Sequence, residues 1–204
     1  MWRVLKYFDE HGNKIKHLQV ERKEQILADT YVEAGDCVLE LGARYGTVSC
    51  ATNIKLSNKK NHVVVEPDER VWKALQENRD MNLCEFHIVK GFVSRKKMEL
   101  VDLDDWRGYG AKSKEVESSR IPSYSLEEIC ECYGIEKFNV LIADCEGFLE
   151  KFLNENPGFL DGLRLIIFEK DNPKECNYRK IKKMLKDKGM VQKVAWFREA
   201  WVKE

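Results

Sequence analysis

Acidic side chains stand at or near the ends of several apolar segments, and they are the residues best suited to chemistry. Four such positions recur along the chain: Glu40, Glu66, Asp144 and Glu169. In an α/β fold, ligands bind in the crevice outside the carboxyl ends of the strands, so these acids are expected to face one ligand. Carboxylates at such a place repel phosphate, attract cations, accept hydrogen bonds from hydroxyl groups and act as general bases.

The first of these acids opens a glycine turn. The apolar run 37–41 contains Glu40, and Gly42 and Gly46 follow before a helix-like segment over 46–57. This pattern predicts a buried strand, a tight turn and a helix start, which together place backbone N–H groups and a carboxylate around a small ligand. A dinucleotide fingerprint would need a glycine where Glu40 stands. The alternative interpretation is a strand followed by an ordinary glycine turn.

The spacing Glu40-x-Gly42-x-x-x-Gly46 resembles the first motif of class I S-adenosylmethionine (SAM) methyltransferases. SAM carries an amino group and a sulfonium but no phosphate, which suits an acidic turn. Glu66 ends the second predicted strand, where an acid can accept two hydrogen bonds from the cis hydroxyls of a ribose, whereas Asp68 better fits a helix cap. Phe92 is either a stacking partner of the adenine or a core aromatic. The expected cofactor contacts are Glu40, Gly42, Ala43, Tyr45, Gly46, Glu66, Pro67, Gly91, Phe92 and Asp144.

The order of apolar segments predicts a doubly wound, Rossmann-like α/β fold in a single domain over 1–204. Strands are expected at 37–41, 62–66, 86–89, 138–143 and 163–168, and a C-terminal antiparallel pair within 191–202. Helices are expected at 46–57, 69–80, 125–133, 148–155 and 176–188. A hairpin is expected within 1–17. The segment 94–124, with strands at 98–103 and 120–124, is expected to form an inserted hairpin that projects over the carboxyl ends of the strands as a substrate lid. The alternative is a surface hairpin without a role.

Composition limits the classes of function. The 204 residues suit one domain, and a formal net charge of zero argues against a strong nonspecific polyanion binder, so nucleic acid is not the expected partner. No apolar segment is long enough to span a membrane, and the first residues lack the apolar core of a signal peptide. The seven cysteines include no CxxC pair, which indicates reduced thiols, no zinc site and a cytoplasmic protein.

A second set of motifs resembles the FkbM-type methyltransferases. The helix start Ser125-Leu126-Glu127-Glu128-Ile129 is followed by a strand that exits through Asp144-Cys145-Glu146-Gly147, and the acid at Glu169 also agrees. The resemblance covers roughly residues 25–203 and implies methyl transfer from SAM to an oxygen, often on a sugar or a natural-product hydroxyl. The sequence departs from the pattern at three places: Ile142 replaces a lysine, Leu149 a glutamate and Arg44 an asparagine.

Methyl transfer to a hydroxyl benefits from a general base. Asp144 is the expected base, with Glu146 and Glu169 as further catalytic candidates nearby. The alternative roles of these acids are helix capping and salt bridging, or holding a divalent cation such as Mg²⁺ that orients the hydroxyl. The expected acceptor is a glycan or another small molecule.

Two other functions fit parts of the sequence. An RNA ribose 2′-O-methyltransferase would use a lysine, aspartate, lysine, glutamate set, and compatible positions exist at Lys23, Asp144, Lys170 and Glu199. A non-catalytic subunit with the SAM fold that binds a partner protein would explain the apolar residues at Ile142 and Leu149.

Overall fold

The computed structural model describes residues 5–16, 20–101 and 111–204. Within these residues, seven strands form a central sheet in the order β12-β13-β11-β10-β3-β4-β5. Their bounds are β3 (Val38–Leu41), β4 (His62–Glu66), β5 (His87–Lys90), β10 (Val140–Ala143), β11 (Leu165–Glu169), β12 (Met190–Ala195) and β13 (Arg198–Lys203). The five neighbouring strands β5, β4, β3, β10 and β11 run parallel to one another. The strand β13 pairs antiparallel with both β11 and β12. The expected Rossmann-like fold with a mostly parallel sheet is confirmed.

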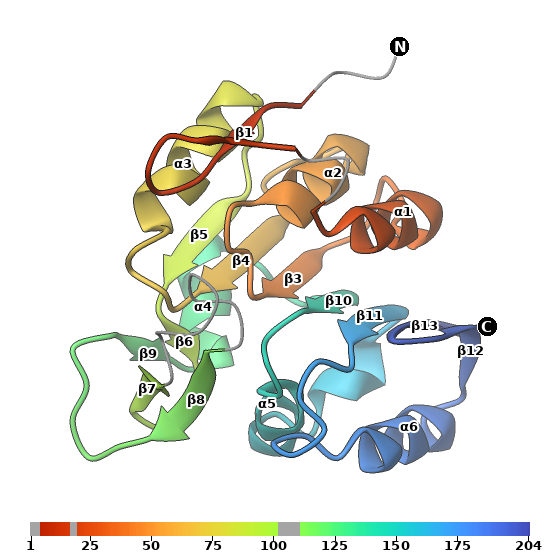
Figure 1. The fold of residues 1–204 in the computed structure, drawn as a ribbon. Coiled ribbons are helices and arrows are strands. Elements are labelled where there is room, and N and C mark those ends of the chain that lie inside the picture. Colours follow the sequence, from red (N-terminus) through yellow and green to blue (C-terminus); the bar gives the residue numbers. More distant parts are fainter. Residues whose placement is uncertain (1–4, 17–19, 102–110) are drawn as a thin grey trace.

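Helices cover both faces of this sheet (Figure 1). One layer contains α1 (Arg22–Tyr31), α2 (Thr47–Lys55) and α3 (Trp72–Met81), and the other contains α4 (Leu126–Tyr133), α5 (Leu149–Glu155) and α6 (Tyr178–Asp187). Successive side chains of a strand point to opposite faces, so a sheet covered on both sides needs continuous apolar runs. In β10, Val140 and Ile142 pack toward α1 and α2, whereas Leu141 packs into the larger cluster on the α5 side.

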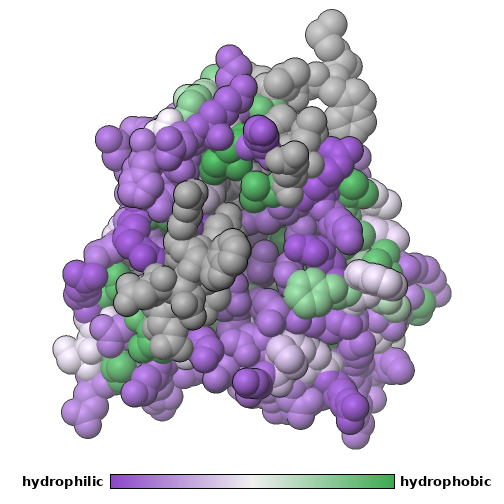
Figure 2. Space-filling model, in the orientation of Figure 1, coloured by the Kyte–Doolittle hydropathy of each residue, from purple (hydrophilic) through white to green (hydrophobic). Residues whose placement is uncertain are grey.

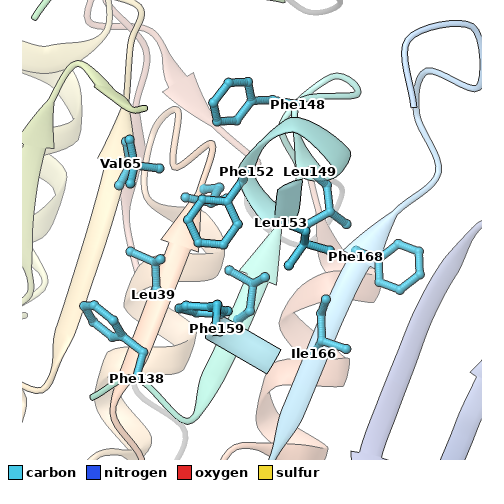
Figure 3. Close-up of a cluster of buried hydrophobic side chains, with 14 of the residues drawn as sticks. Leu39, Val65, Phe138, Phe148, Leu149, Phe152, Leu153, Phe159, Ile166 and Phe168 are labelled. Atoms are coloured by element: carbon cyan, nitrogen blue, oxygen red, sulfur yellow. The ribbon is translucent and has the colours of Figure 1, made fainter. Parts of the chain in front are cut away.

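The larger core lies between the sheet and α5 (Figure 3). Phe152 and Leu153 of α5 pack there with Phe159 of the 3₁₀ helix η2 (Phe159–Gly162). The rings of Phe152 and Phe159 meet edge to face, with their centroids 5.0 Å apart. Leu149, at the first turn of α5, is 1% exposed and belongs to the same cluster. The apolar residue at this departure from the FkbM pattern therefore packs in the core, which anchors the start of α5 behind the exit of β10.

The N-terminal hairpin is formed by β1 (Tyr7–Phe8) and β2 (Lys14–Ile15), within the segment where the sequence predicts one. It lies against α3. The side chain of Asn78 donates to the carbonyl oxygen of Phe8 at 2.9 Å and accepts from its N–H at 2.9 Å. Asn82 accepts from the N–H of Lys6 at 3.0 Å. These two asparagines satisfy the outer backbone groups of the hairpin and fix it on the helix.

The inserted segment differs from the prediction in its pairing. The strand β7 (Met98–Val101) pairs antiparallel with β8 (Lys112–Glu115). The short strand β9 (Ser123–Tyr124) pairs instead with β6 (Phe92–Val93), in parallel. The expected strand at 120–124 is therefore not the partner of β7, because it is held at the exit of β5 by hydrogen bonds such as Phe92 N–H to the Pro122 carbonyl, at 2.9 Å. Residues 102–110, the centre of the expected lid, lie outside the described residues.

Among the helices that the structure describes, none is long and apolar enough to cross a membrane.

Candidate functional site

A cleft of about 460 Å³ opens at the carboxyl ends of the parallel strands. This volume is in the range of small-molecule sites. Leu100, Ala111 and Ser113 of the inserted segment line it together with Leu41 and Val65 of the sheet. In the view of Figure 2, hydrophilic residues predominate on the surface, with smaller hydrophobic areas among them.

The glycine turn after β3 has a steric reason for each glycine. Gly42 has φ +85°, and a Cβ atom there would lie 1.8 Å from the carbonyl oxygen of Asp144. Gly46 has φ +78° at the start of α2, and its Cβ would lie 2.9 Å from a methyl carbon of Leu75. The N–H of Gly42 donates to the carbonyl of Val65 at 2.9 Å. The turn thus joins the exits of three neighbouring strands, β3, β4 and β10, at one point.

Glu66 lines the cleft at the end of β4. One carboxylate oxygen accepts from the N–H of Arg44 at 2.6 Å, and the other accepts from the N–H of Asp68 at 2.7 Å. Burial raises the pKa of Glu66 to about 7, although both backbone donors oppose that rise. Each oxygen has two lone pairs, so both oxygens can accept a further hydrogen bond from a ligand hydroxyl. Pro67 and Gly91, two other expected cofactor contacts, also line the cleft.

Glu40 has a different environment from the one that its motif suggested. Its carboxylate accepts from the Ser49 hydroxyl at 2.7 Å and lies 3.1 Å from Nε2 of His62, in a buried network between the sheet and α2. Glu40 is not among the residues lining the cleft. The reason is strand alternation, because Glu40 shares its face of β3 with Val38, which packs toward α1 and α2.

The remaining turn residues are also placed behind the cleft. Ala43, Tyr45 and Gly46 are buried and do not line it. The Tyr45 hydroxyl instead donates to Glu10 of the N-terminal hairpin at 2.5 Å. Phe92 does line the cleft, but its side chain is 2% exposed and packs against Phe148 with the ring centroids 6.2 Å apart. Phe92 is therefore a core aromatic at the cleft wall.

Three carboxylates meet beside the cleft. Oxygen atoms of Glu24, Asp144 and Glu169 all lie within 4.8 Å of one another. Burial, followed by the charge of Glu21, raises the pKa of Asp144 well above its usual range. Burial and the charge of Asp144 raise the pKa of Glu169 to about 8. Such a group can take up a proton near neutral pH, and the oxygen atoms are of the kind that a divalent cation binds.

A guanidinium group already contacts this cluster. Arg198, at the start of β13, has Nη2 at 2.7 Å from Oε2 of Glu169 and pairs through Nε with Glu24. Arg198 also lines the cleft and lies over the ring of Phe197, 5.5 Å from its centroid. Sequence reasoning missed both Glu24 and Arg198. Neither follows a glycine turn or ends an apolar strand, so no local pattern marks them.

The loop after β10 is fixed by Asp171. The N–H of Glu146, which has φ +51°, donates to the Asp171 carboxylate at 2.5 Å, and the Tyr178 hydroxyl donates to its other oxygen. Glu146 lines the cleft together with Asp144 and Glu169, so the structure brings the three expected catalytic residues to one place.

The residues of the ribose 2′-O-methyltransferase alternative do not come together in the cleft. Lys23 is exposed on α1, while Lys170 pairs with Glu199 at 3.0 Å. Glu199 is fully buried, and it also pairs with Lys182 and accepts from Nε1 of Trp201 at 2.9 Å. Of these four residues, Asp144 alone lines the cleft.

Comparison with solved structures agrees with this architecture. The precorrin-6y C5,15-methyltransferase from Geobacter metallireducens GS-15 aligns with a TM-score of 0.59 and 12% identity, over 99% of this chain and 100% of its own. The cofactor-bound Rv0187 from MTB aligns with a TM-score of 0.54 and 12% identity, over 91% of this chain and 79% of its own. A protein of the NADB-Rossmann superfamily from Streptococcus agalactiae aligns with a TM-score of 0.54 and 9% identity, over 88% of this chain and 66% of its own. No protein-family model matches the chain, and the search of curated proteins gives no significant match.

These likenesses establish the fold. The chain shares a Rossmann-like fold with the solved precorrin-6y C5,15-methyltransferase, and its cleft lies at the carboxyl ends of the strands.

Proposed function

We propose that the protein is a SAM-dependent methyltransferase that methylates a hydroxyl group of a glycan or another small molecule. The observation that carries the proposal is the pairing of two kinds of acid in one cleft. Glu66 offers a carboxylate oriented by two backbone N–H groups, and Asp144 and Glu169 offer carboxyl groups with raised pKa values. The first kind suits the hydroxyls of a ribose, and the second suits the removal of a proton from an acceptor.

SAM fits the residues that are present, because Glu66 retains acceptor capacity and the acids of the cleft complement a cationic ligand. SAM supplies a methyl group bonded to a sulfonium sulfur, and that sulfur is a good leaving group because it departs as a neutral thioether. The chain then has two tasks, which are to align the acceptor with that methyl group and to take the proton of its hydroxyl. We assign the second task to Asp144, since it lines the cleft at the exit of the central strand β10.

Cofactor binding is tested first by calorimetry with SAM. Glu66→Ala should bind SAM more weakly by about 1.5–3 kcal/mol, the cost of losing hydrogen bonds to a charged group. Glu77→Ala, at an exposed glutamate on α3, is the matched control and should bind SAM like the parent protein. Equal affinity of Glu66→Ala and the parent would show that the ribose assignment is wrong.

The acceptor is tested separately with a panel of glycans, small hydroxylated compounds, nucleotides and short RNAs, using radiolabelled methyl transfer from SAM. The proposal expects label on a hydroxyl oxygen of a glycan or small molecule. Label on RNA alone would replace the proposed acceptor, and SAM binding without transfer to any member of a broad panel would favour the non-catalytic alternative.

A further inference from the structure

We propose that Arg198 is a positioning residue that serves as the built-in cation of the carboxylate cluster. It holds Glu24 and Glu169 beside Asp144 and occupies the place that a divalent metal ion would take. The part that concerns methyl transfer rests on the proposed function, whereas the part that concerns metal binding does not.

The geometry of the ion pairs carries this inference. Arg198 contacts Glu24 through Nε and Glu169 through Nη2, so one planar guanidinium connects two carboxylates of the cluster. A guanidinium is suited to this task because its donors are fixed in a fork and it stays charged at any ordinary pH. The antiparallel pairing of β11 with β13 places Arg198 opposite Glu169, and Glu24 reaches the same point from α1. Three elements far apart in the sequence therefore converge on one positive charge.

Charge balance explains why a cation stabilises the ionised form of this cluster. Glu24 is 3% exposed. Carboxylate oxygens of Glu24, Asp144 and Glu169 lie within 4.8 Å of one another. Buried like charges repel strongly, since the surrounding protein screens them less than water does. Either a guanidinium or a metal ion relieves that repulsion. Both would bind the carboxylates of Glu24 and Glu169, and two cations held by the same pair of carboxylates would repel each other, so binding of one disfavours binding of the other.

This arrangement has a consequence for methyl transfer. The two acids that pair with Arg198 are fixed as its partners, which leaves Asp144 as the carboxyl group of the cluster for proton removal. Removal of the guanidinium should disturb the orientation of the cluster without removing any group that contacts the ribose. The expected effect is therefore on turnover rather than on SAM affinity.

The direct experiment is a Mn²⁺ titration followed by electron paramagnetic resonance on the full chain, which needs no acceptor. The parent protein should show no stoichiometric Mn²⁺ site that depends on Asp144. Arg198→Met should gain one site, at least tenfold tighter than any binding by the parent, and the double variant Arg198→Met/Asp144→Asn should lose it. Arg95→Met, which removes an arginine paired with Glu127 on another part of the surface, is the matched control and should gain no site.

Two outcomes would overturn the proposal. One is a stoichiometric Mn²⁺ site in the parent protein that Asp144→Asn abolishes, and the other is a folded Arg198→Met that gains no site. Should Arg198→Met not fold by circular dichroism, Arg198→Lys against Arg198→Gln provides the same comparison, with a site expected only in the glutamine variant. None of these results depends on SAM, so failure of the proposed function remains distinguishable.

The positioning role has its own readout once an acceptor is known. Arg198→Met should lose at least tenfold in kcat with SAM affinity unchanged, and added guanidinium ion at non-denaturing concentration should restore part of the loss. A loss of SAM affinity with no recovery by guanidinium would contradict the positioning role, since it would indicate a general structural defect.

Discussion

The turn at Gly42 lies directly against the backbone of Asp144. A Cβ atom on Gly42 would come within 1.8 Å of the Asp144 carbonyl oxygen, so the glycine motif and the proposed base are in contact through their main chains. This contact links the cofactor half of the cleft to its catalytic half, because any side chain at residue 42 would displace the exit of β10.

The first prediction follows from that contact. Gly42→Ala should lower the free energy of unfolding by at least about 2 kcal/mol, because alanine combines an unfavourable φ with a backbone overlap. Gly12→Ala is the matched control, since Gly12 has φ +78° but no atom within 4 Å of its Cβ position, and it should show the smaller cost of φ alone. Urea denaturation measures both. An equal loss in the two variants would mean that the turn shifts freely.

The second prediction concerns pH. Burial raises the pKa of Glu66 to about 7, against the backbone N–H groups of Asp68 and Arg44, which lower it, so below pH 7 this carboxyl is mostly protonated in the free protein. A group with a raised pKa binds its proton more tightly in the folded protein, and a ligand that prefers the carboxylate must release that proton. SAM affinity should therefore rise from about pH 6 to pH 8 and level off above the pKa.

Calorimetry in buffers of different ionisation enthalpy measures the released proton directly. Glu66→Gln should flatten the pH dependence and reduce the proton release near pH 7. An affinity that is constant across this range in the parent protein would contradict the raised pKa of Glu66.

The third prediction separates binding from catalysis. Asp144→Asn should retain SAM affinity and lose about 10²–10⁴-fold in the rate of methyl transfer, the usual contribution of a general base. Single-turnover methylation and calorimetry on the same protein make the comparison, with Asp161→Asn on the surface as control. Full turnover by Asp144→Asn would remove Asp144 from the mechanism and leave Glu146, which also lines the cleft, as the next candidate.

The same turnover assay, run on the parent protein, tests the metal alternative. If a divalent cation orients the acceptor, a chelator should abolish turnover by the parent protein and added Mg²⁺ should restore it. The role proposed for Arg198 expects turnover by the parent to be insensitive to the chelator.

The fourth prediction concerns the core behind the cleft. Leu153→Ala should lower the free energy of unfolding by about 2–5 kcal/mol, because Leu153 is fully enclosed between α5 and the sheet (Figure 3). Leu83→Ala makes the same chemical change at a residue that is 62% exposed, and it should cost no more than about 0.5 kcal/mol. Similar losses at the two positions in thermal denaturation would argue against this packing of α5.

The sequence alone determined the elements whose signals are local. The pattern Ser125-x-x-Glu128 predicts a helix start, and both reciprocal hydrogen bonds of that capping box are present. The apolar runs of β3, β4, β10 and β11 predict strands buried on both faces, since they are only four or five residues long and most are rich in β-branched residues. Gly42 follows the same logic, because a sharp turn between strand and helix favours a residue without a side chain.

The tertiary structure decided which acids face the cleft and what neutralises them. Glu40 and Glu66 both belong to apolar strands, yet Glu40 lies in a buried network beside α2 and Glu66 lines the cleft. Glu24 and Arg198 are 174 positions apart by their numbers and carry no local signal, and they meet because α1 and β13 both pack around β11. Spacing along the chain fixes secondary structure through short-range sterics, whereas the partner of a charge depends on which surfaces the folded sheet brings together.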